Sequence, residues 1–178
     1  MEKREELRER AEHALTALQS LVQKIRELEM RSPPRTYAGV VESIAAFLAD
    51  GRTPAQDDEL LHTVHASAHH WRFAGGTPAN LARAENQCAR VYAALSRGEA
   101  AVHHATRCLE LVEAGGEDFE DWDLASALEV TARAHLAAGD LARAEEFAAR
   151  SRKALDQIAD PDDRAVIADQ LAELHLPG

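Results

Sequence analysis

Apolar residues recur at spacings of three and four along most of the chain, which is the period of an amphipathic α-helix. The alternation of β-branched and aromatic residues that is typical of strands is nearly absent. Proline and glycine interrupt the helical pattern at intervals and mark the helix ends. The pattern therefore predicts an all-α protein of about eight helices that form a single domain over residues 1–178.

Residues 1–31 are predicted to form one long helix with a narrow apolar stripe. Seven of its side chains follow the alternating spacing of four and three residues that defines a heptad seam: Leu7, Ala11, Ala14, Leu18, Leu21, Ile25 and Leu28. Two interpretations stay open for this helix. It is either an N-terminal brace along the rest of the bundle or the seam of a homodimer, because a helix of this length overhangs the shorter hairpins.

Helix start signals divide the rest of the chain. Residues 36–74 are predicted to form a diverged hairpin, with a turn at Gly51 and a second helix that begins at Thr53-Pro54. Two further hairpins are predicted over residues 77–115 and 120–158. Residues 160–176 complete the chain as a single helix whose polar outer positions suit the terminal cap of a repeat stack.

The two central hairpins match each other when one is shifted by 43 residues. The match covers residues 82–111 of the first unit and 125–155 of the second. Similar residues then coincide at several positions: Ala89 with Ala132, Arg90 with Arg133, Ala101 with Ala144, and Ala105 with Ala148. An internal period of this length indicates stacked units, each of which buries its apolar face against its neighbours.

The two units resemble tetratricopeptide repeats. Each has an aromatic or imidazole side chain three positions after a small residue, Tyr92 and His135, and the second has the family's Gly139-Asp140 turn. The resemblance implies a right-handed stack of antiparallel hairpins with a concave groove that binds a peptide, a protein or a small acidic ligand. The sequence departs from the family in its longer period and its missing closing proline. It also departs at the bulky position early in each unit, where Glu85 stands in the first and Leu128 in the second.

Composition and net charge limit the classes of partner that we expect. The formal net charge of −11 argues against nucleic acid and anionic membranes, both of which attract basic surfaces. No apolar run approaches the roughly 20 residues of a membrane span, and the charged start is not a signal peptide, so we expect a cytoplasmic protein. Cys88 and Cys108 are expected to be reduced, buried, small apolar residues.

The aligned units place polar side chains on the first helix of each hairpin, which lines the concave groove in the repeat family. Arg90 and Arg133 share one repeat position on adjacent helices, so their guanidinium groups are candidates to hold a carboxylate in that groove. Asn86 and Glu129 each lie one turn before these arginines, and Trp71 is the candidate apolar wall. The alternative is internal pairing, of Arg133 with Glu129 and of Arg90 with a neighbouring glutamate.

Six of the nine histidines gather in two predicted helices, within residues 62–70 and at residues 103–104. If the second helices of consecutive hairpins run parallel, His65 approaches His104, whereas His69 and His70 lie near Glu85. Imidazoles in either group are candidate ligands for Zn, Ni, Cu or Fe, and these five residues form the candidate metal set. The alternative is that the histidines are polar packing residues with bonded ring nitrogens.

No glycine-rich phosphate loop, Gly-x-Ser-x-Gly elbow or dinucleotide fingerprint occurs in the sequence. We therefore predict no catalytic residue and, apart from the metal alternative, no cofactor. The favoured function is recognition of a peptide, a protein or a small acidic ligand. The alternatives are a metal-binding protein or metalloenzyme and a dimeric regulatory or scaffold subunit.

Overall fold

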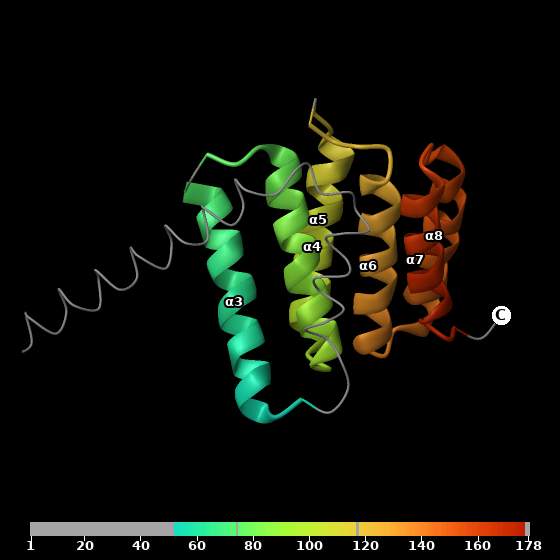
Figure 1. The fold of residues 1–178 in the computed structure, drawn as a ribbon. Coiled ribbons are helices and arrows are strands. Elements are labelled where there is room, and N and C mark those ends of the chain that lie inside the picture. Colours follow the sequence, from blue (N-terminus) through green and yellow to red (C-terminus); the bar gives the residue numbers. More distant parts are fainter. Residues whose placement is uncertain (1–51, 74, 117, 177–178) are drawn as a thin grey trace, which may run out of the picture. The chain divides into compact units, whose positions relative to one another are not determined.

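The computed structural model describes residues 52–73, 75–116 and 118–176, and every regular element in these ranges is a helix (Figure 1). The elements are α3 (Pro54–Phe73), α4 (Pro78–Ala94), α5 (Gly98–Ala114), α6 (Asp123–Ala137), α7 (Leu141–Ala154), the short 3-10 helix η1 (Leu155–Gln157) and α8 (Pro161–Ala172). The all-α prediction is confirmed for this part of the chain. The heptad seam of residues 1–31, the predicted helix before Gly51 and that turn lie outside the described residues, so the brace and dimer interpretations stay predictions.

The helices follow one another side by side in the order of the sequence. Helix α4 packs against α3, α5 and α6, and α6 packs against α5, α7 and α8 (Figure 1). The pairs α4–α5 and α6–α7 are the two matched hairpins, and α3 lies on the opposite side of α4 from α6. This order brings α3, α4 and α5 together at one end of the described helices.

Side-chain caps place the helix starts where the sequence predicts them. Thr77 caps α4 in a reciprocal capping box, because its backbone N–H donates to Asn80 Oδ1 at 3.1 Å and its hydroxyl accepts from the Asn80 N–H at 3.3 Å. Asp160 caps α8 by accepting from the Asp162 N–H at 2.8 Å. Each cap is followed by a proline at the first helical position.

The turns of the two hairpins have the same geometry. Ser96 and Gly139 both adopt a positive φ, of 56° and 79°. The next residue in each turn donates its N–H at 2.9 Å to the carbonyl five positions earlier, Arg97 to Tyr92 and Asp140 to His135. Tyr92 stacks on His104 at 7° between ring planes, and the equivalent His135 and Phe147 stack at 5°. The backbone therefore follows the 43-residue period found in the sequence.

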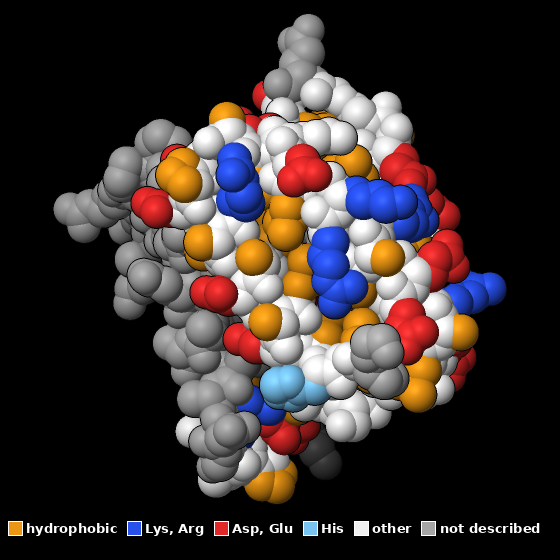
Figure 2. Space-filling model, turned by 90° about the vertical axis from the view of Figure 1, so that its right-hand side faces the viewer, with side chains coloured by type: hydrophobic (Ala, Val, Ile, Leu, Met, Phe, Trp, Pro, Cys, Tyr) orange, Lys and Arg blue, Asp and Glu red, His pale blue; other side chains and the backbone are white. Residues whose placement is uncertain are grey.

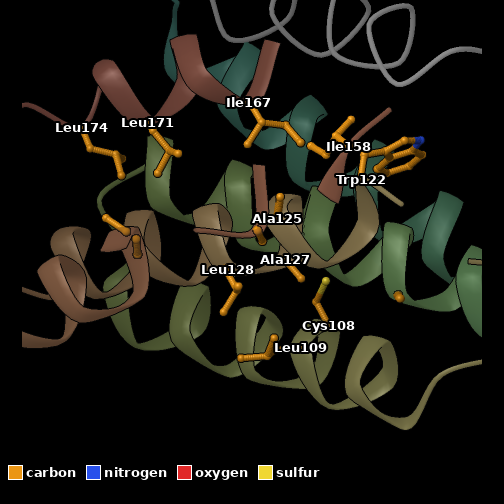
Figure 3. Packing of buried hydrophobic residues seen from close by; sticks show 14 residues of the cluster. Cys108, Leu109, Trp122, Ala125, Ala127, Leu128, Ile158, Ile167, Leu171 and Leu174 are labelled. Atoms are coloured by element: carbon orange, nitrogen blue, oxygen red, sulfur yellow. The ribbon is translucent and has the colours of Figure 1, made fainter. Parts of the chain in front are cut away.

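Small residues let the hairpins approach closely. A Cβ on Gly98, the first residue of α5, would lie 2.4 Å from the Cα of Ala138, so only glycine fits there. Figure 3 shows the largest apolar cluster, in which Ile158, Ile167 and Leu171 lie on one side of α6 and Cys108 and Leu109 on the other. This packing makes α6 the centre of the apolar core.

The face formed by α7 and α8 is mixed in charge. Figure 2 shows the side of the molecule formed by α7 and α8, where acidic and basic side chains alternate with small groups of hydrophobic atoms. Among the described residues, the large apolar side chains that stand out from the surface are Phe73 and Leu141. No helix in that part of the chain is both long and apolar enough to cross a lipid bilayer.

Candidate functional site

A polar cavity of about 510 Å³ lies between α3, α4 and α5. We call it the histidine pocket. Its walls are formed by His65, Ala68, His69 and Arg72 of α3, Glu85 and Cys88 of α4, and His103, His104 and Arg107 of α5. The volume falls in the range of small-molecule sites, and four imidazoles, two guanidinium groups and one carboxylate line it.

Helical spacing explains why these side chains share a cavity. On α3, His65, His69 and Arg72 follow one another at four and three residues and so lie on one face of the helix. On α5, His104 and Arg107 are three residues apart and share a face in the same way. The two faces meet over α4, which contributes the carboxylate of Glu85.

Glu85 is the buried anion of the pocket, with 6% of its surface exposed. Its Oε2 accepts a hydrogen bond from Nδ1 of His104 at 2.6 Å, and its Oε1 lies 3.4 Å from one guanidinium nitrogen each of Arg72 and Arg107. Burial alone would raise the pKa of this carboxyl group. The hydrogen bonds and charges of His104 and Arg107 outweigh burial, and the pKa of Glu85 is lowered.

The imidazole of His104 is held on two sides. Because the carboxylate of Glu85 can only accept, Nδ1 of His104 carries the hydrogen of this bond, and Nε2 has the lone pair whenever the ring is neutral. The ring also stacks on Tyr92, with centroids 5.3 Å apart. His104 is therefore fixed in both orientation and tautomer.

His65 faces His104 from α3, with their ring centroids 5.7 Å apart. Its Nε2 lies 2.7 Å from the hydroxyl oxygen of Tyr92, within hydrogen-bonding distance. Burial lowers the pKa of His65, and the neighbouring imidazoles of His104 and His62 lower it further, while the charge of Glu85 opposes them. Tyr92 thus links the histidines of α3 and α5.

Cys88 and Cys108 are both buried and unbridged, as the sequence predicts. Burial raises the pKa of each thiol to about 12. Cys88 lines the pocket, but a thiol of this pKa carries almost no thiolate at neutral pH. Neither cysteine is therefore suited to act as a nucleophile.

Four of the five candidate metal residues meet in the histidine pocket: His65, His69, Glu85 and His104. The sequence predicts the approach of His65 to His104 and the proximity of His69 to Glu85 as two separate candidate sites. In the structure, all four side chains line one cavity. The side chain of His70 lies outside the described part of the structure. Within the described residues, no three His, Cys, Asp or Glu side chains are already arranged to hold a metal ion.

The candidate groove residues meet elsewhere, in a buried network between α4, α6 and α8. Arg90 donates to the carboxylate of Glu129 and, at 2.6 Å, to Oε1 of Gln170. Arg133 donates to the other oxygen of Glu129 at 2.9 Å, and Asn86 accepts from Arg90 at 3.1 Å. These contacts match the internal pairing left open by the sequence.

Trp71, the candidate apolar wall, lies on a different helix from each residue of this network. It belongs to α3, and α4 lies between α3 and α6 (Figure 1). The helix order therefore separates the candidate apolar wall from Glu129 and Arg133, both of which α6 carries.

The residues predicted from the sequence do not include Arg72 and Arg107, the two arginines that line the pocket. The signal was present in the spacing, because Arg72 lies seven residues after His65 and Arg107 three after His104. The repeat alignment holds a second signal. Shifted by 43 residues, Glu85 falls on Leu128 and His104 falls on Phe147, and in the second hairpin these two residues are in or against the apolar core.

The comparisons with known proteins add no family. No protein-family model, curated protein or solved structure matches this chain. The assignment of a function therefore rests on the geometry of the histidine pocket.

Proposed function

We propose that the protein is a binding module built as a tetratricopeptide-like stack of hairpins, and that its ligand is a small carboxylate held in the histidine pocket. One observation carries the proposal. Where the second hairpin has Leu128 and Phe147, the first has the hydrogen-bonded pair of Glu85 and His104 at the wall of a cavity. The second hairpin packs without a polar pair, so a ligand is the best explanation of this departure from the repeat.

The charges of the pocket favour an anionic group. Two guanidinium groups face a single carboxylate, which leaves an excess of one positive charge when the imidazoles are neutral, in a chain of net charge −11. Arg72 and Arg107 keep 60% and 47% of their side-chain surface exposed. They can therefore turn toward a ligand, and the planar guanidinium group matches a carboxylate with two parallel hydrogen bonds.

The network around Arg90 and Arg133 is a less suitable place for the same ligand. A carboxylate that took these arginines would displace Glu129, whose side chain is 0% exposed. Leaving a buried carboxylate without its partners costs about 3–5 kcal/mol. The contacts of Glu85 to Arg72 and Arg107 are longer than those of Glu129 to its arginines. Glu85 also keeps its hydrogen bond to His104 when Arg72 and Arg107 turn toward a ligand.

A transition metal is the second candidate ligand, favoured by one observation. Glu85 orients His104 through Nδ1, the arrangement by which a carboxylate positions an imidazole for a metal at Nε2. His65 would have to leave Tyr92 if it were to bind the metal through Nε2. Equilibrium dialysis against Zn²⁺ and Ni²⁺, followed by elemental analysis, tests this candidate, and a protein that retains neither metal excludes it.

The carboxylate proposal is tested by calorimetric titration with succinate, malate and aspartate. We expect Arg107→Gln to weaken binding about tenfold, because a hydrogen bond to a charged group is lost. Arg150→Gln is the matched control, because Arg150 occupies the equivalent position on α7 and its substitution removes the same charge. Arg150 pairs with Glu113 at 3.1 Å. The proposal is wrong if none of the three compounds binds, or if both variants weaken binding equally.

A further inference from the structure

We infer that the ligand of the histidine pocket carries a hydrogen-bond donor, an ammonium or hydroxyl group, next to its carboxylate. The carboxylate binds Arg72 and Arg107, and the donor binds Oε1 of Glu85. This inference rests on the proposed function, because it specifies which carboxylates the same pocket prefers.

The two oxygens of Glu85 have different partners. Oε2 has a short contact, 2.6 Å from Nδ1 of His104. Among the described residues, the contacts of Oε1 are those to Arg72 and Arg107, each of 3.4 Å. Charge-assisted bonds between guanidinium and carboxylate groups are usually about 2.7–2.9 Å long. Oε1 is therefore the weakly held atom of the pair.

A ligand carboxylate competes for those two contacts. When Arg72 and Arg107 turn to the ligand, Oε1 loses both of its donors while Glu85 remains buried. A buried acceptor without a donor opposes binding, and so does the repulsion between two neighbouring carboxylates. A carboxylate ligand without a donor group therefore forms its contacts with the two arginines by removing them from Glu85.

A donor on the ligand removes this penalty. An ammonium or hydroxyl group bonds to Oε1 in place of the arginines, so every charged group of the pocket keeps a partner. The donor must lie within one or two bonds of the carboxylate, because both arginines already lie within 3.4 Å of the oxygen that the donor has to reach. Hydroxy acids and amino acids have this arrangement.

Three dicarboxylates with the same four-carbon chain isolate the effect. Succinate has no donor, malate adds a hydroxyl group, and aspartate adds an ammonium group. In calorimetric titrations at pH 7.5 we expect malate and aspartate to bind at least about tenfold more tightly than succinate. The comparison of malate with aspartate then shows whether the donor has to be charged.

Two variants test which side chain causes the preference for malate and aspartate. Glu85→Leu introduces at position 85 the leucine that the second hairpin has at the equivalent position 128. It should reduce the differences in affinity among the three ligands to within about threefold. Arg72→Gln changes an exposed side chain, and it should weaken all three ligands by a similar factor. Circular dichroism verifies that both variants are folded.

Equal affinity of the wild-type protein for the three dicarboxylates would overturn the inference and leave the proposed function intact. The inference is also wrong if the folded Glu85→Leu variant still prefers malate and aspartate, because the donor then has another acceptor. If none of the three binds, the inference and the proposed function fail together.

Discussion

The exchange of the polar pair in the first hairpin for the apolar pair of the second is the sharpest test of the site. The double variant Glu85→Leu/His104→Phe makes α4 and α5 match α6 and α7 at these positions. We expect it to fold at least as stably as the wild-type protein and to lose the preference for malate and aspartate over succinate, because Arg72 and Arg107 remain while the acceptor for the ligand's donor is removed. Stability and ligand selectivity then change in opposite directions, as they do where a site is kept at a cost to stability.

The magnitude follows from the contacts of the two side chains. His104→Phe alone leaves Glu85 buried with its two 3.4 Å contacts to Arg72 and Arg107, and breaking a buried pair costs about 3–5 kcal/mol, here toward the lower end. Replacing both partners by apolar residues is instead neutral or stabilising by about 1–4 kcal/mol. A phenylalanine at position 104 also keeps an aromatic ring against Tyr92, as Phe147 does against His135.

Urea unfolding monitored by far-UV circular dichroism measures these differences. With a slope of about 1–3 kcal/mol per molar urea, His104→Phe should lower the midpoint by roughly 1–3 M. The double variant should return to the wild-type midpoint or exceed it. The two substitutions then differ from additivity by about 3 kcal/mol, as expected for residues in direct contact. If the double variant instead loses the sum of the two single effects, the polar pair is structural and the reasoning is refuted.

Three further predictions follow from packing and burial. Burial lowers the pKa of His135 in the folded state despite the opposing charge of Asp140, so the unfolded protein binds the proton more readily. The free energy of unfolding should therefore decrease as the pH falls below 6.5, the ordinary pKa of a histidine, and His135→Tyr should reduce this decrease in urea titrations at pH 7.5 and 5.5. Gly98→Ala should destabilise the protein by about 1–3 kcal/mol in thermal unfolding, because its Cβ would lie 2.4 Å from the Cα of Ala138, and an unchanged melting temperature would contradict the close approach. Cys88 and Cys108, with thiol pKa values of about 12, should react with a disulfide reagent only after urea is added, whereas rapid labelling of the native protein would show that they are accessible.

Within the described residues, the sequence alone was enough to predict the helices, their capped starts and the repeat, because these depend on residues close together in the chain. The Thr77 and Asp160 caps form with residues two or three positions away, and the hairpin turns close over five residues. The 43-residue period could be read for the same reason, since each hairpin repeats its own local pattern. The buried cysteines were also predictable from their residue type.

The packing of the helices determines which of their side chains come together. Arg90 and Arg133 share a repeat position, yet whether they face a ligand or a carboxylate depends on Glu129, which binds both, and on α8, whose Gln170 bonds to Arg90. The histidine pocket requires α3, α4 and α5 to meet, so that Glu85 reaches His104 over a separation of 19 residues. Such contacts depend on how whole helices pack against one another, and the period of one helix specifies only which of its side chains share a face.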